Sequence, residues 1–289
     1  MADSQTKNIR KVALTSLAGT SIEWYDFFLY GTAAAIIFPK AFFPSDMPAM
    51  VALIASFSTF AVGFLARPLG GIIFGHFGDR VGRKQTLVLA LLIMGTSTTL
   101  IGLLPTYATI GYIAPLILVL LRFVQGLAIG GQWGGAMLLV TESAPADKRG
   151  WYGAYAQAGA PIGVILANLA FLGVSGGMSE DAFLDWGWRL PFLASIVLIG
   201  VSLYVQLNLE DTEAFKKLAN NQSEKSIEDT PSRRSPIVEV IVNYPKRIFL
   251  AAGAFLSIQV TFYILIAFIM AYGVNSPSVM LSRDTMLTS

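Results

Sequence analysis

The stretch Gly75-His76-Phe77-Gly78-Asp79-Arg80-Val81-Gly82-Arg83-Lys84 is a polar segment between two apolar runs, residues 51–74 and 85–104. Each run is long enough to cross a bilayer as a helix, so the sequence predicts a tight hairpin between two membrane-spanning helices. Its glycines are expected to let the backbone turn sharply and approach its neighbours closely. Basic residues concentrate in cytoplasmic loops, so the hairpin is predicted on the cytoplasmic side.

The composition also indicates a membrane protein. Hydrophobic residues make up 54% of the 289 residues, charged residues only 13%, and the mean hydropathy is +0.62. A soluble domain carries about 25% charged residues. The net charge of +2 gives no basic footprint for nucleic acid. Cysteine is absent, which excludes disulfides and thiolate metal sites, and the single histidine, His76, is interpreted as a structural loop residue. No metal or cofactor is expected.

The apolar runs predict helices at about residues 12–38, 50–74, 85–104, 111–140, 151–174, 186–207 and 248–272. Lys7, Arg10 and Lys11 precede the first helix, so the N-terminus is predicted to be cytoplasmic. Trp186 and Trp188 are predicted to form an interfacial belt. Three regions follow: a bundle over residues 1–207, a polar cytoplasmic loop over 208–245, and the start of a second bundle over 246–289.

The first predicted helix carries two acids, Glu23 and Asp26. An ionisable side chain at membrane depth costs about 3 kcal/mol on insertion scales. Helical spacing places both acids on one stripe with Tyr30. Such a stripe favours a cavity or a polar partner helix, so the acids are predicted to line a transport pathway; the alternative is that they only hold helices together.

The helix at 111–140 carries a second polar constellation around Arg122, which lies too deep to be interfacial. An unpaired guanidinium at that depth favours a functional role. Glycines recur every four residues at Gly126, Gly130 and Gly134, which predicts a smooth face for close helix packing. Hydrogen bonds or a stacking surface for a ligand are expected from three side chains there, Gln125, Gln132 and Trp133, and from Asn168 on the helix at 151–174.

The hairpin pattern resembles the signature loop of the major facilitator superfamily, with matching positions Gly75, Asp79, Arg80, Gly82, Arg83 and Lys84. Residues 17–31, 64–71, 122–135 and 186–192 resemble its metabolite:proton symporter branch. The resemblance implies an all-α integral membrane protein of the bacterial plasma (inner) membrane, with twelve helices in two six-helix bundles. It also implies import of a small organic ion such as a dicarboxylate, shikimate, proline or a betaine. In this chain the sequence ends where the eighth helix is expected.

The resemblance further implies that an acid on the first helix faces an arginine on the fourth, which corresponds here to Asp26 and Arg122. The leading hypothesis is proton-coupled symport by alternating access, with Asp26 as the proton carrier beside Arg122. The expected partners are the lipid bilayer, protons and a small organic ion, and no nucleic acid. The candidate cavity residues are Glu23, Tyr30, Gln125, Gln132, Trp133 and Asn168.

Two alternatives belong to other classes of function. The chain could be a transport-inactive, regulatory or assembly subunit that pairs with a full-length homologous membrane chain. An intramembrane enzyme is disfavoured, because the sequence shows no nucleophile–base pair, metal cluster or phosphate-binding loop. The charge of the substrate stays open: the two acids of the first helix fit a cation, whereas Arg67 and Arg122 fit a carboxylate.

Overall fold

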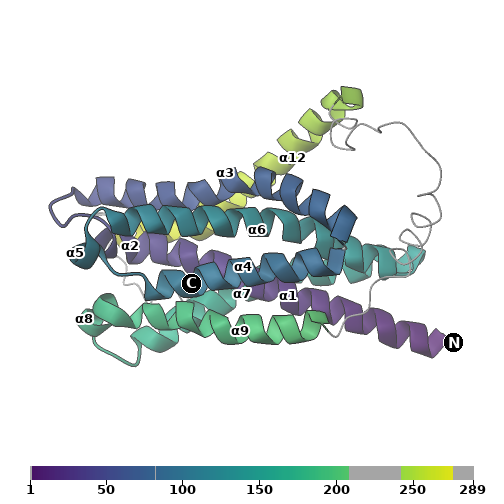
Figure 1. The fold of residues 1–289 in the computed structure, drawn as a ribbon, viewed down its shortest axis with the longest axis horizontal. Helices are drawn as coiled ribbons and strands as arrows, with labels where there is room; N and C mark the ends of the chain where they lie inside the picture. Colours follow the sequence, from purple (N-terminus) through teal and green to yellow (C-terminus); the bar gives the residue numbers. More distant parts are fainter. Residues whose placement is uncertain (1, 82, 208–241, 276–289) are drawn as a thin grey trace. The chain divides into compact units, whose positions relative to one another are not determined.

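The computed structural model of the protein describes residues 2–81, 83–207 and 242–275, and every element in these ranges is helical (Figure 1). The helices divide into two compact units, which we describe separately. The first unit holds six long helices, α1 Ala2–Ile36, α3 Ala49–Val81, α4 Arg83–Leu103, α6 Ile113–Ser143, α7 Arg149–Ser175 and α9 Arg189–Leu207. The all-helical fold and six-helix bundle expected from the sequence are therefore confirmed.

Short helices connect the long ones of the first unit. They are α2 Phe38–Ala41, α5 Tyr107–Ile110, the 3₁₀ turn η1 Ala146–Lys148, α8 Glu180–Ala182 and the π-helical turn η2 Phe183–Gly187. Helices α2, α5 and α8 lie at one end of the unit, and the N-terminus lies at the other (Figure 1). The chain therefore runs up and down, with alternate connections at opposite ends, as expected when each long helix crosses a membrane.

The second unit contains α12 Pro245–Tyr263, the π-helical turn η3 Ile264–Phe268 and α13 Ile269–Asn275. The sequence predicts one continuous helix over residues 248–272. The structure interrupts that helix with the wider π turn, in which one extra residue is accommodated without ending the helix.

Four helical segments in the described part of the chain are long and apolar enough to cross a membrane: Ala49–Phe77, Gln85–Leu103, Ile113–Gly131 and Ala146–Ser175. A fifth is obtained when Glu180–Gly187 and Arg189–Val201, bent by 50°, count as one span. Helix α1 is also long enough, but the polar side chains along it lower its apolar character. Its polar stripe must therefore be buried against other helices.

The polar hairpin predicted at residues 75–84 is wrong in extent. Helix α3 continues through Val81 and α4 begins at Arg83, so most of the stretch is helical. A helix does not have to end where it leaves the hydrocarbon core of the membrane. Its backbone hydrogen bonds remain satisfied until a residue that breaks the helix is reached. Among the described residues outside its own stretch of helix, no atom lies within 4 Å of the position of a Cβ on Gly75, so these residues do not show the close approach expected at this glycine.

Glycines allow α3 and α6 to pack closely. A Cβ atom on Gly126 would lie 2.8 Å from Cβ of Ala66 and would also meet the carbonyl oxygen of Gly63. One on Gly130 would meet the carbonyl oxygen of Arg67. Helices α3 and α6 share the most extensive contact in the unit. The packing role predicted for Gly126 and Gly130 is confirmed; the surroundings of Gly134 lie outside the described side chains.

Glycines also allow two further pairs of helices to pack closely. On α7, Gly159 lies against Thr20 of α1. On α4, Gly102 lies against α9, where a Cβ would come within 2.8 Å of Cβ of Phe192. Each of these close pairs joins helices that are distant in the sequence. The six helices therefore form a single packed unit rather than three consecutive hairpins.

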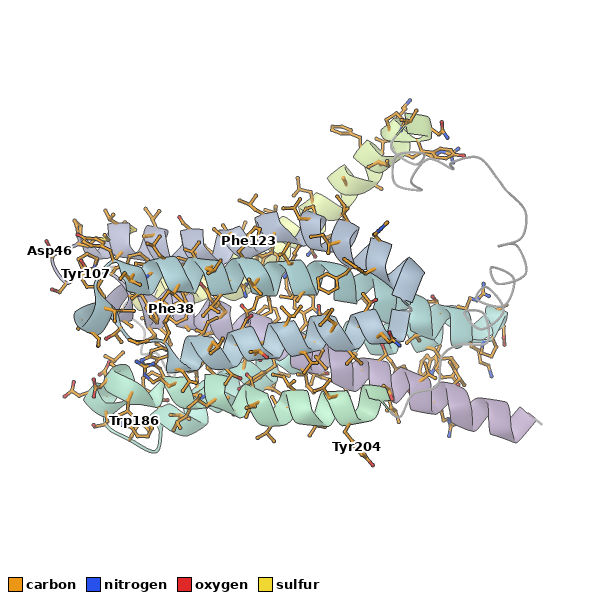
Figure 2. The ribbon with its side chains drawn as sticks, viewed as in Figure 1. Phe38, Asp46, Tyr107, Phe123, Trp186 and Tyr204 are labelled. Carbon is orange, nitrogen blue, oxygen red and sulfur yellow. The ribbon has the colours of Figure 1, made fainter. Side chains whose placement is uncertain are left out.

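An aromatic cluster fills the bundle near α2. Phe38, Phe42 and Trp188 are fully buried, and their rings pack edge to face. Trp186, in contrast, is 49% exposed and lies on the outside of the unit, whereas Phe38 lies within it (Figure 2). The prediction of an interfacial position is wrong for Trp188, which directly follows the turn η2 and packs against Phe38 of α2 and against Phe42.

Gly130→Ala is expected to lower the free energy of unfolding of the helical bundle by about 1–3 kcal/mol, because the added methyl group meets the backbone of α3. Thermal unfolding of the purified protein in detergent measures the change. The control is Gly200→Ala on α9, where a Cβ has open space within 4 Å. Equal stability of the two variants would contradict the close α3–α6 contact.

Candidate functional site

Asp26 is held at the centre of a hydrogen-bonded cluster. It lies on α1 with 1% of its surface exposed. Its Oδ1 accepts a hydrogen bond from Ser195 Oγ of α9 at 2.7 Å, and its Oδ2 accepts one from Thr98 Oγ1 of α4 at 3.1 Å. Two neutral hydroxyl groups from two other helices therefore hold the carboxylate.

The cluster continues from Thr98 to Arg122 on α6. Gln125 Nε2 donates a hydrogen bond to Thr98 Oγ1 at 2.6 Å, and Arg122 Nη1 donates one to Gln125 Oε1 at 3.0 Å. All of these residues are buried. The acid and the arginine are close enough to interact through their charges. A hydrogen-bonded path between them runs through Thr98 and Gln125.

Aromatic rings surround the guanidinium of Arg122. Its central carbon lies 4.2 Å from the ring centroid of Tyr30, 4.7 Å from that of Phe60 and 5.1 Å from that of Phe27. The faces of aromatic rings attract cations, and they do so more strongly away from water. Room for the side chain comes from Gly63, where a Cβ would lie 2.7 Å from Arg122 Nε.

Tyr30 is fixed by a hydrogen bond of its own. Its hydroxyl lies 2.7 Å from Thr59 Oγ1, and Thr59 donates its proton to the carbonyl oxygen of Ser56 at 2.7 Å. Tyr30 is therefore the donor in the first contact. This bond orients the ring on which Arg122 rests.

Glu23 lies one helical turn from Asp26 and is only 3% exposed. Its Oε2 has no hydrogen-bond partner in the described part of the structure. Asp26 repels its charge, and Arg67 of α3 attracts it. The guanidinium of Arg67 is half-buried and lies 4.7 Å from the ring centroids of both Phe27 and Phe64. Phe27 thus contacts both arginines, and Glu23 retains an oxygen that can accept a further hydrogen bond.

The remaining predicted residues are Asn168, Gln132, Trp133 and the cytoplasmic motif. Asn168 on α7 is half-buried, and its Oδ1 accepts a hydrogen bond from Thr32 at 3.5 Å. Gln132 and Trp133 lie on α6, but their side chains are outside the described part. The same holds for the side chains of the predicted cytoplasmic motif, Asp79, Arg80, Arg83 and Lys84, and position 82 is not described at all.

Thr98 and Ser195 are functional residues that the sequence does not single out. Both are single small hydroxyl residues on otherwise apolar helices, where such residues are frequent and commonly bond to their own backbone. The available signal is indirect. A buried acid on α1 requires donors from its neighbours, but the sequence does not specify which hydroxyl faces it.

Comparison with known proteins shows that the chain is similar to membrane transporters. A family model described as sugar (and other) transporter matches residues 11–243. The chain is 47% identical over 262 residues to an inner membrane metabolite transport protein of Escherichia coli (strain K12). It is 44% identical over 274 residues to a shikimate transporter of the same strain, and 36% identical over 267 residues to a proline/betaine transporter of Salmonella typhimurium (strain LT2).

These alignments cover 91%, 92% and 91% of this chain but 58%, 59% and 53% of the relatives. The chain thus spans little more than half the length of the relatives that it matches. Among solved structures, a D-xylose–proton symporter matches with a TM-score of 0.68 at 17% identity, over 97% of this chain and 64% of that one. A partially occluded, inward-open xylose transporter from E. coli matches with a TM-score of 0.67 at 16% identity, over 97% and 68%. At such identities, the likeness shows the fold.

Arg122→Met is expected to destabilise the bundle by about 3–5 kcal/mol, because it leaves the charge of Asp26 buried without its cation. Adding Asp26→Asn in the same protein should recover about 1 kcal/mol or more, since the two residues are coupled. Thermal unfolding in detergent of both single variants and the double variant measures this coupling. A parallel cycle with exposed Asp46→Asn in place of Asp26→Asn serves as the control and should be additive. Additivity in the Asp26 cycle as well would contradict the linkage.

Proposed function

Because the chain belongs to the sugar (and other) transporter family of the major facilitator superfamily, we propose that it takes part in proton-coupled symport of a small organic ion across the bacterial inner membrane. The family comprises membrane transporters, not enzymes. Its similar relatives are named for metabolite, shikimate and proline/betaine transport, and one is named as an inner membrane protein. We extend to this chain their shared property, the movement of a small solute.

The observation that carries the proposal is the burial of Asp26 among neutral hydroxyls and near Arg122. A carboxyl group in such a place can bind and release a proton, because its charged form depends on hydrogen bonds and on a nearby cation. Proton binding removes the negative charge that faces Arg122. The balance of charge inside the bundle then changes by one unit, which can favour one transporter conformation over another.

Substrate binding is proposed for the neighbouring face of α1 and α6. Glu23 has a carboxylate oxygen with no hydrogen-bond partner among the described residues, and Arg67 supplies positive charge near it. Tyr30, Gln125, Gln132, Trp133 and Asn168 are the further cavity residues that we propose. A region with both carboxylates and guanidinium groups can bind the positive and the negative group of a zwitterion. It can also bind a simple cation or a simple carboxylate.

The membrane orientation follows the distribution of basic residues. We propose that the N-terminus and the region from Gly75 to Lys84 face the cytoplasm, where the latter gates the pathway. Residues 1–207 would form the N-terminal bundle, 208–245 a cytoplasmic loop, and 246–289 the beginning of a second bundle. Alternating access would arise from rocking of one bundle against the other.

Asp26→Asn is expected to abolish uptake driven by a proton gradient and to spare exchange of internal for external substrate, because exchange needs no net proton movement. Both are measured in liposomes containing the native gene product. Asp46→Asn, which removes an exposed acid, is the control and should behave as wild type. Unchanged proton-driven uptake in Asp26→Asn would disprove the assignment. Absence of all transport by the wild-type chain would instead favour the regulatory or assembly role.

Glu23→Gln is expected to keep the proton dependence of uptake and to raise the KM for a charged substrate about tenfold, which is the loss of one charge-assisted hydrogen bond. The pH profile and KM are measured in the same liposomes. A variant with wild-type KM and an altered pH profile would transfer Glu23 from substrate binding to proton coupling.

A further inference from the structure

Thr98 occupies a position with two competing acceptors for one proton. Its side chain is fully buried on α4. Its Oγ1 lies 3.1 Å from Asp26 Oδ2 and 3.0 Å from the carbonyl oxygen of Met94, and it accepts a hydrogen bond from Gln125 Nε2 at 2.6 Å. A hydroxyl group donates a single hydrogen bond and can accept two. Thr98 can therefore donate to the carboxylate or to its own helix, but not fully to both.

Ser195, on the other side of the carboxylate, differs in this respect. Its Oγ lies 2.7 Å from Asp26 Oδ1, and the structure records no second acceptor for it in the described part of the chain. If Oδ1 took up a proton, the buried Ser195 hydroxyl would lose its acceptor at a cost. Protonation at Oδ2 carries no such cost, because the Thr98 hydroxyl can turn to Met94. The asymmetry favours Oδ2 as the site of the proton.

We propose that Thr98 is a positioning residue whose hydrogen bonds change direction when Asp26 is protonated. This change alters the hydrogen bond to Gln125, which in turn contacts Arg122. When Asp26 is ionised, Thr98 donates to Oδ2. When Oδ2 carries a proton from the aqueous phase, Asp26 donates to Thr98, and Thr98 turns its own proton to the carbonyl of Met94. No proton passes through Thr98. The inference rests on the proposed role of Asp26 as the proton carrier.

The reversal changes the bond between Thr98 and Gln125. In the ionised state, the Thr98 oxygen accepts one hydrogen bond, from Gln125; in the protonated state it accepts two. At the same time, Arg122 loses the negative charge near it and keeps its link to Gln125. The change in the Thr98–Gln125 bond reaches Arg122 through the hydrogen bond between Gln125 and Arg122. The loss of the charge on Asp26 acts on Arg122 through space.

The charged groups near Asp26 come from α1, α3 and α6. Glu23 of α1 and Arg122 of α6 interact with it directly through their charges, and Arg67 of α3 acts on Glu23. The hydroxyl of Tyr25 on α1 is a further titratable group that interacts with Asp26. The two other helices that contact the carboxylate, α4 and α9, contribute the neutral hydroxyls of Thr98 and Ser195. Thr98 is therefore a neutral element in a charged cluster, and its removal leaves the formal charges unchanged.

The test is Thr98→Val, which keeps the shape of the side chain and removes the hydroxyl. Loss of one hydrogen bond to a charged carboxylate makes ionised Asp26 less stable. The pH at which proton-driven uptake is half-maximal should therefore rise by about one unit, a tenfold change in proton concentration. Thr98→Ser, which retains the hydroxyl, should restore the wild-type pH profile.

The control is Thr99→Val, at the adjacent position of α4, where the hydroxyl donates to the backbone of Gly95. This variant should leave the pH profile unchanged. A wild-type profile for Thr98→Val together with loss of proton-driven uptake in Asp26→Asn would overturn the inference and keep the proposed function. Retained proton-driven uptake in Asp26→Asn would instead overturn the proposed function itself.

A second measurement does not require the valine variant to fold. The infrared carbonyl band of protonated Asp26, identified in the wild-type protein by its absence from Asp26→Asn, reports whether the acid donates a hydrogen bond. A hydrogen-bonded band is expected, because Thr98 accepts from Oδ2. A band typical of a carboxylic acid that accepts a hydrogen bond from Ser195 at Oδ1 but donates none would overturn the proposal.

Discussion

The first unit is organised by the burial of charge in an apolar interior. Asp26, Arg122 and Glu23 are each at most 3% exposed, and burying such groups without partners costs several kcal/mol. The surrounding helices offset this cost, because their hydroxyl groups, one amide and several aromatic rings interact with the buried charges. Side chains from α1, α3, α4, α6 and α9 therefore converge on one cluster, and the positions of these helices depend on it.

Close packing makes this convergence possible. Gly63 on α3 both contacts Gly126 of α6 and leaves space for the side chain of Arg122, so one residue serves the packing and the cluster. Small residues let backbones approach in membranes, where apolar side chains have no preference for one another over lipid. The glycines of α3 and α6 thus determine how deeply the guanidinium lies among its aromatic partners.

The positions of the helices could be predicted from the sequence because long apolar runs have few alternative structures in a membrane. The family resemblance implies that Asp26 faces Arg122, but neither it nor the sequence shows that Gln125 and Thr98 join them. Thr98 and Ser195 could not be identified, because a hydroxyl can bond to its own helix and periodicity does not show which neighbour it faces. The end of α3 and the burial of Trp188 were mispredicted, because local backbone geometry determines both.

The helix pairs in this bundle have a consequence for biosynthesis. One of the two hydroxyl groups that hold Asp26 belongs to Ser195, 169 residues later in the chain, and Tyr25 donates to the carbonyl of Pro191, 166 residues away. Helix α1 is made first, but its polar groups find these partners only when α9, the last long helix of the unit, has been made. The order of synthesis and the order of stabilisation are opposed. A nascent chain that stalls before α9 therefore lacks one of the two hydroxyl donors of Asp26 and the acceptor of Tyr25.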